Sequence, residues 1–281
     1  MKNFSLNMSG RLVEFDRPAV MAIVNATPDS FFAGSRVATA DQVARRTESL
    51  LAEGADIIDL GACSTRPGSE SPDADEELRR LESALEAIRR VSADVPVSVD
   101  TFRASVARRC VTELGADIIN DISGGTLDPT MFDTVTETGA PYVMMHTRGT
   151  PETMQQLTDY SAYGSVTAAV LEFFAERIAD LAGRGVADII VDPGFGFAKT
   201  VEQNWQLMRE LPALLAFERP LLVGVSRKSM LTRPLQISAD EALPATVAAN
   251  VMALERGAMI LRVHDAAAAR QAIDIVSLLD Q

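Results

Sequence analysis

The sequence has few cysteines, no long apolar run and no excess of positive charge. Cys63 and Cys110 are the only cysteines among 281 residues, too few for a disulfide framework or a tetrahedral metal site. No apolar stretch approaches the roughly 20 residues that cross a bilayer, and the start, Met1-Lys2-Asn3-Phe4, lacks the apolar stretch of a signal peptide. We therefore expect a soluble, cytoplasmic protein with reduced thiols.

The charge balance limits the partners. A formal net charge of −13 argues against nucleic acid, because contacts to phosphates need a basic face. An anionic small molecule would need locally concentrated Arg and Lys. The hydrophobic content of 47% allows a large core, and the length fits one barrel or two smaller domains.

Short β-rich runs alternate with amphipathic stretches along the chain. The β-rich runs are residues 19–24, 57–60, 97–99, 118–119, 142–145, 189–191, 221–223 and 260–262, and the amphipathic stretches include residues 41–53, 75–91, 104–114, 166–182, 245–255 and 266–279. Strict alternation implies parallel strands with right-handed helical crossovers, and eight such units in about 250 residues close into a (β/α)8 TIM barrel. We therefore predict an α/β fold with a single barrel domain over residues 1–281.

The first 18 residues do not fit the alternation. Two alternating runs around Ser9-Gly10, within residues 3–15, predict a β-hairpin that caps the bottom of the barrel. An open doubly wound sheet would share the later alternation, but it usually has a glycine-rich fingerprint after its first strand. Here that turn reads Asn25-Ala26-Thr27-Pro28-Asp29-Ser30, which favours the barrel.

Polar residues follow the apolar runs, at the strand ends where a (β/α)8 barrel places its active site. In chain order they are Asn25; Asp59 with Ser64-Thr65-Arg66-Pro67; Asp100; Asn120-Asp121; His146; Asp192; Ser226-Arg227-Lys228; and Arg262 with His264. Singly, each could cap a helix or lie in solvent. Their joint occurrence predicts a binding site.

The residue types in this ring indicate the ligand. Asp100, Asn120 and Asp192 offer hydrogen-bond partners to a flat, nitrogen-rich ring such as a 2-amino-4-oxopteridine. The cations suit a diphosphate and a carboxylate; they are Arg66, Lys228, Arg262 and, if it is protonated, His264. We expect Lys228 to reach the ring and Ser226 the carboxylate.

Several motifs resemble one enzyme family. Asn25-Ala26-Thr27-Pro28-Asp29-Ser30-Phe31 and Ser64-Thr65-Arg66-Pro67-Gly68 resemble the two loop signatures of dihydropteroate synthases. Further matches are Ser98-Val99-Asp100-Thr101, Asn120-Asp121-Ile122-Ser123-Gly124-Gly125, Met145-His146, the run from Asp192 to Thr200, Ser226-Arg227-Lys228-Ser229 and Arg262-Val263-His264-Asp265. They occur in order along almost the whole chain.

The resemblance implies an activity and a set of partners. A dihydropteroate synthase is a transferase of folate biosynthesis and a sulfonamide target. It condenses (7,8-dihydropterin-6-yl)methyl diphosphate with 4-aminobenzoate to 7,8-dihydropteroate and diphosphate. The family mechanism is dissociative and needs no protein nucleophile. A Mg²⁺ cofactor and a homodimer are also implied.

The resemblance further implies a role for each matching position. Pterin would be bound by Asp100, Asn120, Met145, Asp192, Phe197, Lys228 and Arg262; 4-aminobenzoate by Thr65, Arg66, Pro67 and Ser226; and diphosphate by Asn25, Arg262 and His264, with Asn25 as the metal ligand. Catalysis would rest on Lys228, Arg262, His264 and Asp100. The loops at residues 26–34 and 62–72 would close over the substrates.

Both loops depart from the family pattern. The first reads Phe32-Ala33 where an acidic residue is usual after Ser, and the second begins Ala62-Cys63 in place of Gly-Glu. The departures leave rate and sulfonamide response open. They also make a non-catalytic pterin-binding paralogue an alternative. A pterin-dependent methyltransferase domain is a further alternative, but it would not need Ser-Thr-Arg-Pro or Ser-Arg-Lys-Ser.

Overall fold

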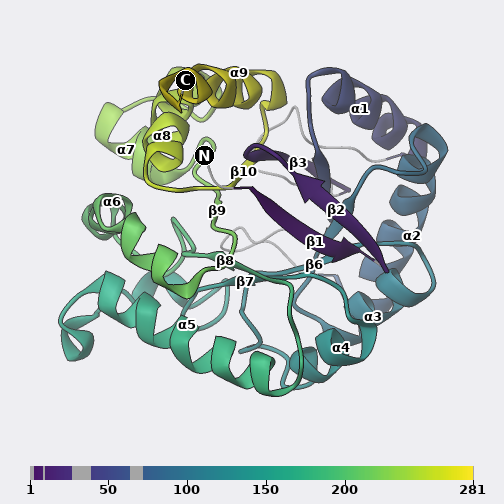
Figure 1. Ribbon diagram of the computed structural model, residues 1–281, viewed down its shortest axis with the longest axis horizontal. Helices are drawn as coiled ribbons and strands as arrows, with labels where there is room; N and C mark the ends of the chain where they lie inside the picture. The colour runs from purple at the N-terminus through teal and green to yellow at the C-terminus, as the bar shows by residue number, and fades with distance from the viewer. Residues whose placement is uncertain (1–2, 9, 27–38, 64–71, 281) are drawn as a thin grey trace.

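A barrel of parallel strands forms the centre of the computed structural model, which describes residues 3–8, 10–26, 39–63 and 72–280 (Figure 1). The barrel strands are β3 (Ala19–Asn25), β4 (Ile57–Gly61), β5 (Val97–Asp100), β6 (Ile118–Asp121), β7 (Tyr142–Met145), β8 (Ile189–Asp192), β9 (Leu222–Val223) and β10 (Ile260–Val263). Their order is β8-β7-β6-β5-β4-β3-β10-β9, and a parallel bridge between Val191 and Leu221 joins the two ends. The predicted (β/α)8 TIM barrel is confirmed.

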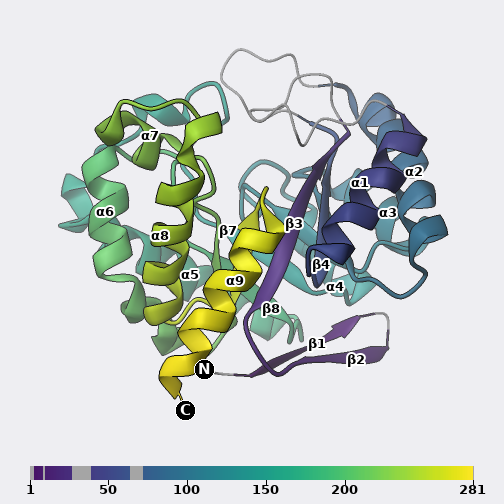
Figure 2. The same cartoon turned by 90° about the horizontal axis from the view of Figure 1, so that it is seen from above.

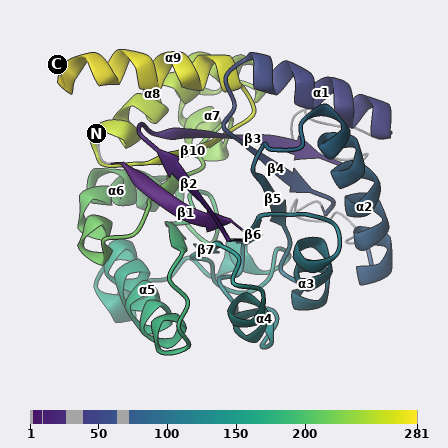
Figure 3. The same cartoon turned by 45° about the vertical axis from the view of Figure 1, so that its right-hand side comes forward.

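Helices follow the strands and surround the barrel (Figure 3). They are α1 (Ala40–Ala52), α2 (Ala74–Val91), α3 (Ala104–Thr112), α4 (Met131–Thr138), α5 (Val166–Gly183), α6 (Val201–Arg209), α7 (Ser229–Leu235), α8 (Leu243–Glu255) and α9 (Ala266–Ser277), with short 3-10 turns η2 (Met154–Gln156), η3 (Ser161–Tyr163), η4 (Leu211–Phe217), η5 (Asp240–Ala242) and η6 (Leu278–Asp280). Capping boxes begin α1, with Thr39 and Gln42, and α6, with Thr200 and Gln203. Within the described part of the chain, no helix has the length and apolar character that would let it cross a membrane.

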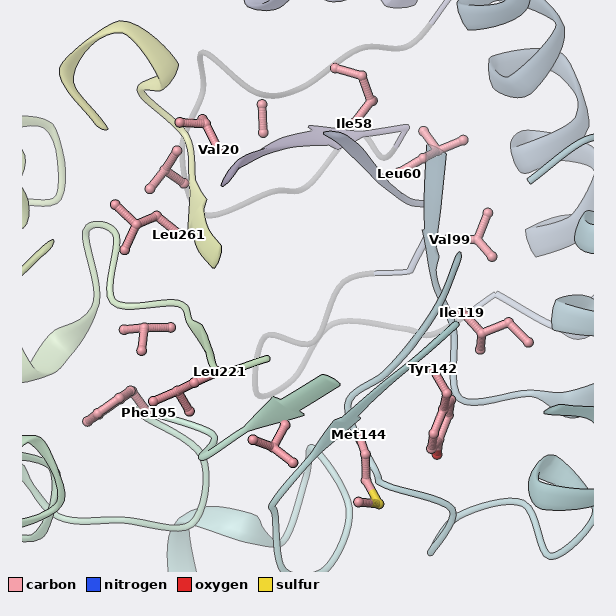
Figure 4. Packing of buried hydrophobic residues seen from close by; sticks show 14 of the residues in the cluster. Val20, Ile58, Leu60, Val99, Ile119, Tyr142, Met144, Phe195, Leu221 and Leu261 are labelled. Atoms are coloured by element: carbon pink, nitrogen blue, oxygen red, sulfur yellow. The ribbon is translucent and has the colours of Figure 1, made fainter. Parts of the chain in front are cut away.

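The outward faces of the strands carry most of the core. Val20, Val99 and Ile119 are fully buried and point away from the barrel centre, towards the helices (Figure 4). Such strands read as continuous apolar runs because both of their faces are covered. Burying each of these side chains contributes about 1.5–3 kcal/mol. The rigid scaffold leaves the strand ends to carry the polar groups.

The predicted N-terminal hairpin lies across the other end of the barrel (Figure 2). Strand β1 (Phe4–Met8) pairs antiparallel with β2 (Arg11–Phe15). Leu6 and Met8 are buried in a cluster with Ile57, Ile118 and Ile190 from the barrel strands. The hairpin therefore caps the bottom, opposite the strand ends where the site was expected.

Candidate active site

Residues from four neighbouring strands lie in one row at the carboxyl end of the barrel. Asn25 of β3 pairs in register with Gly61 of β4, which pairs with Asp100 of β5, and Asp100 pairs with Asn120 of β6. A Cβ on Gly61 would lie 3.4 Å from Oδ1 of Asn25 and 3.6 Å from Cβ of Asp100. The strand register thus brings three of the predicted site residues together around a glycine.

Arg262 extends from β10 between two carboxylates. Its Nε donates to Oδ2 of Asp59 at 2.7 Å, and its Nη2 donates to Oδ2 of Asp100 at 2.7 Å. The Nδ2 of Asn120 donates to both carboxylate oxygens of Asp59, at 3.1 and 3.3 Å. Asp59 is fully buried, so Arg262 and Asn120 compensate its charge. Sequence reasoning placed Asp59 in the ring of polar residues but gave it no role.

The protonation of this cluster follows from its burial. Burial raises the pKa of Asp100 to about 7; Arg262 opposes this increase and Asp59 adds to it. Burial lowers the pKa of Arg262, but the carboxylates of Asp59 and Asp100 outweigh it and the net shift is upward. Arg262 is therefore a permanent cation, whereas Asp100 can take up or release a proton near neutral pH.

Lys228 and Asp192 lie on the other side of the barrel. The Nζ of Lys228 donates to the carbonyl of Phe195 at 2.6 Å and lies 4.6 Å from the ring centre of Phe197. Oδ1 of Asp192 accepts the N–H of Gly194 at 2.8 Å. Burial lowers the pKa of Lys228 to about 8, against the effect of Asp192. Burial likewise raises the pKa of Asp192, against the effect of Lys228.

The end of β7 lies beside this pair. Met145 is buried and pairs in register with Asp192. His146 follows, and its ring packs edge-on against Phe173 at 5.0 Å. Burial, with a further contribution from Lys199, keeps the pKa of His146 well below its ordinary value. His146 is therefore a packed, neutral imidazole and not an open member of the polar ring.

Ser226 and His264 are hydrogen-bonded to each other. The backbone N–H of His264 donates to Oγ of Ser226 at 3.3 Å, and this Oγ lies 2.9 Å from Nδ1 of His264. Burial, then the charge of Arg262, lowers the pKa of His264 to about 3. His264 is therefore neutral at neutral pH and adds no positive charge to the rim. In the tautomer whose Nδ1 accepts a hydrogen bond from the Ser226 hydroxyl, the N–H of the imidazole lies at Nε2.

Arg227 joins the two loops that carry these residues, a link that the sequence did not reveal. Its Nε and Nη2 donate to the carboxylate of Asp265 at 2.9 and 2.8 Å, and its Nη1 donates to the carbonyls of Ala239 and Asp240 at 2.6 and 3.0 Å. Its φ of 58° lies in the left-handed region. Ser226 and Lys228 flank Arg227 in this turn, so the contacts of Arg227 hold both of them in place. A non-glycine residue is uncommon in this conformation.

Asp121 does not belong to the site, although the sequence placed it in the ring. Its carboxylate accepts the hydroxyl of Tyr142 at 2.7 Å and the N–H groups of Ser123 and Gly125 at 2.7 and 2.8 Å. Successive residues of a strand face opposite sides. Asn120 therefore faces the barrel interior, and Asp121 stabilises the turn outside it.

The predicted 4-aminobenzoate residues Thr65, Arg66 and Pro67 lie outside the described residues, as do Phe32 and Ala33. Arg103 contacts the residues on both sides of residues 64–71. Its Nη1 lies 3.5 Å from Sγ of Cys63 and its Nη2 donates to the carbonyl of Pro72 at 2.8 Å. Glu77, fully buried, forms an ion pair with Arg103.

Cys63 occupies the position where the family usually has a glutamate. Burial, then the charge of Glu77, raises the pKa of its thiol to about 12. The side chain is therefore a neutral thiol and does not replace the missing acid. Ala62, the other departure among the described residues, is fully buried.

Asn25 and Asp100 offer the oxygen donors that Mg²⁺ prefers. No three His, Cys, Asp or Glu side chains converge as a metal cluster in the part of the chain that the structure describes. Mg²⁺ at a substrate phosphate needs only one or two protein oxygens, since water and phosphate complete its shell. Oδ1 of Asn25 and Oδ2 of Asp100 lie 3.4 and 3.9 Å from the same point at Gly61, and both are suitable oxygen donors.

Comparisons with known proteins agree with this geometry. The family model of pterin binding enzymes matches residues 21–264. The dihydropteroate synthase of Synechocystis sp. is 43% identical over 267 residues, which cover 94% of this chain and 90% of that protein. The dihydropteroate synthase of Yersinia pestis, solved with a sulfonamide drug, superimposes with a TM-score of 0.92 at 36% identity over 99% of both chains. That of Coxiella burnetii, in complex with pteroic acid, gives a TM-score of 0.89 at 33% identity over 98% of both chains.

The barrel and its polar strand ends are thus those of a pterin-binding enzyme, and the chain belongs to that family. Within it, the identity and coverage of its relatives assign it to the dihydropteroate synthases. The predicted resemblance is confirmed.

Proposed function

We propose that the chain condenses (7,8-dihydropterin-6-yl)methyl diphosphate with 4-aminobenzoate, which gives 7,8-dihydropteroate and diphosphate. The observation that carries this proposal is the group formed by Asp59, Asp100, Asn120 and Arg262 at the carboxyl end of the barrel. Its side chains are hydrogen-bonded to one another before a ligand arrives, so it is preorganised for a polar, planar ring. The relative that binds pteroic acid, a pterin joined to 4-aminobenzoate, supports the same chemistry.

In this proposal the pterin ring lies between the two sides of the barrel. Asp192 and Asn120 accept from the ring's amino and N–H groups, and Lys228 donates to its oxygen and nitrogen acceptors. Asp100 faces the remaining ring nitrogen. Arg262 stacks on the ring, as guanidinium groups do on flat π-systems, while Met145 and Phe197 line it.

The reaction breaks the bond between the pterin methylene carbon and a diphosphate oxygen. Arg262 and the Nε2–H of neutral His264 stabilise the charge that develops on the departing diphosphate. Ionised Asp100 stabilises the positive charge that develops on the pterin. The amine of 4-aminobenzoate then attacks the methylene carbon, forms the C–N bond and loses one proton to solvent. Lys228 keeps the ring in place throughout.

Mg²⁺ bound with the diphosphate would neutralise part of its charge, with Asn25 as a protein ligand. We place the carboxylate end of 4-aminobenzoate at Ser226, Thr65, Arg66 and Pro67. These assignments rest on the family resemblance.

We also infer that the protein is a cytoplasmic homodimer and that its ligands are the small molecules named above. Leu235 of α7 and Met252 of α8 are apolar side chains with 57% and 41% exposure, and the two helices are neighbours in Figure 1. A second copy that packs against these helices would cover such side chains.

The direct test follows both products at once. Purified protein is incubated with the pterin diphosphate, 4-aminobenzoate and Mg²⁺, with Asp192→Ala as the control. Equal release of diphosphate and dihydropteroate, lost in Asp192→Ala, supports the proposal. Pterin binding without either product would point to the non-catalytic paralogue, and diphosphate without dihydropteroate would mean that the arylamine is not presented.

A further inference from the structure

Lys199 has a buried ammonium group that the proposed reaction does not use. It lies in the loop between β8 and α6 with 4% exposure. Its Nζ donates to the carbonyls of Gly194 and Phe197 at 2.9 and 3.0 Å and lies 3.0 Å from Nδ1 of His146. The carbonyl of His146 lies 3.4 Å from the same Nζ, so four acceptors surround the three N–H bonds of an ammonium group. Burial lowers the pKa of Lys199 to about 7, and Asp192 opposes this shift; the hydrogen bonds hold the side chain whether or not it is charged.

The loop that Lys199 binds also carries the groups around the pterin end of the site. Gly194 donates to Asp192, the carbonyl of Phe195 accepts from Lys228, and the ring of Phe197 lies beside the same ammonium. Lys199 binds the loop at Gly194 and at Phe197, so it fixes the backbone on both sides of Phe195. Through His146 it also connects the loop to the end of β7.

The loop and β7 are packed too closely for adjustment. Gly194 has a φ of 71°, and a Cβ at this position would overlap the carbonyl oxygen of His146. Tyr160 adds a hydrogen bond from its hydroxyl to the carbonyl of Ala198 at 3.0 Å. The ammonium of Lys199 lies inside this layer and is its central donor.

The choice of lysine at this position is informative because the chain has few of them. Lysine occurs three times, as Lys2, Lys199 and Lys228, against 26 lysines and arginines in all. Arginine therefore supplies almost every other cation. A planar guanidinium is larger and binds in a fork, whereas an ammonium is compact and donates in three directions. The acceptors around Lys199 lie in several directions, which suits the compact ammonium better than the planar guanidinium.

We infer that Lys199 is a positioning residue for pterin binding: it holds the β8–α6 loop so that Asp192, Phe197 and Lys228 take the geometry that the ring needs. The inference rests on the proposed function, since it assumes a pterin at these residues. Lys199 itself does not touch the substrate. Its removal would lower pterin affinity and leave the 4-aminobenzoate end unchanged.

The test compares Lys199→Met with a matched variant at the opposite end of the barrel. Arg89 is a suitable control, because its guanidinium also binds backbone carbonyls, those of Val95 and Gly115, at 2.6 Å each. Pterin binding is measured by calorimetry. The KM for each substrate is measured while the other substrate is saturating, and stability is measured by urea unfolding. For Lys199→Met we expect at least a tenfold higher KM for the pterin and less than a threefold change in the KM for 4-aminobenzoate.

Arg89→Met should lose stability but keep pterin affinity within twofold. If Lys199→Met loses stability while its pterin KM stays that of the unsubstituted protein, Lys199 is a structural residue only and the inference is overturned. Lys199→Gln, which keeps two donors, serves the same comparison where the Met variant does not fold. Failure of the proposed function is a separate outcome, since the unsubstituted protein would then bind no pterin.

Discussion

The carboxylate of Asp59 accepts hydrogen bonds from Arg262 at 2.7 Å and from Asn120 at 3.1 Å. One buried charge on β4 therefore orients two side chains that belong to β10 and β6. Because Asn120 donates its Nδ2 to Asp59, its Oδ1 is directed elsewhere. The acceptor pattern of the site depends on a residue that need not contact the ligand.

Replacement of Asp59 should test this dependence. Asp59→Asn leaves Arg262 with one ion-pair partner fewer, and loss of one member of a buried pair costs about 3–5 kcal/mol. We expect urea unfolding to show that loss and calorimetry to show at least tenfold weaker pterin binding. Asp56→Asn, which breaks the ion pair with Arg270 at the start of β4, should affect stability alone. Unchanged pterin affinity in Asp59→Asn would contradict the orienting role.

The two histidines of the chain should make the protein sensitive to acid. His264 has a folded-state pKa of about 3, below the unfolded value of about 6.5. As the pH falls, the unfolded state therefore binds a proton before the folded state does. The free energy of unfolding is highest above about pH 6.5 and decreases towards pH 3, by up to about 1.4 kcal/mol per pH unit. Urea unfolding of the unsubstituted protein and of His264→Gln between pH 7 and pH 4 measures this. The difference between them should shrink as the pH falls; a constant difference would contradict it.

The close approach at Gly194 should exclude any side chain. Gly194→Ala places a methyl group on the carbonyl oxygen of His146, and we expect a loss of more than about 3 kcal/mol together with pterin binding. Gly139 has a similar φ of 63°, and among the described residues no atom lies within 4 Å of its added Cβ. Gly139→Ala should therefore cost only about 1 kcal/mol. Equal effects of the two substitutions would show that backbone strain alone decides.

Both thiols should be unreactive in the folded protein. Burial raises the pKa of Cys63 and of Cys110 to about 12 each. At pH 8 the thiolate fraction is then roughly a thousandfold below that of a free cysteine. A thiol-exchange reagent should titrate two groups in denaturant and almost none in the folded state. Rapid reaction of one group without denaturant would contradict the raised thiol pKa.

The barrel could be predicted because its information is local. Each apolar run and each amphipathic stretch is visible in a short window, and observed helices such as α2 begin within a residue or two of their expected positions. The polar residues at strand ends were also visible, since Asp100 and Asp192 directly follow apolar runs. Parallel strands bring their carboxyl ends to one side, so the sequence predicted the neighbourhood of these residues without their distances.

The partners of these residues could not be predicted in the same way. Strand alternation separates Asn120 from Asp121, but the barrel register decides which of the two faces inward. The protonation of His264 depends on its burial beside Arg262, and this burial is produced by residues that are distant in the sequence. Lys199 was part of a motif, yet its partner His146 comes from another strand end. Long-range contacts of this kind are set by packing.

The N-terminal hairpin limits how substrates enter the barrel and how products leave it. Leu6 and Met8 close one end of the barrel against the beginnings of the strands. The polar residues at the strand ends can therefore be reached from the opposite end only. In the proposed reaction, whatever enters first lies deepest, and diphosphate and dihydropteroate must depart past the same rim by which the pterin and the arylamine arrived.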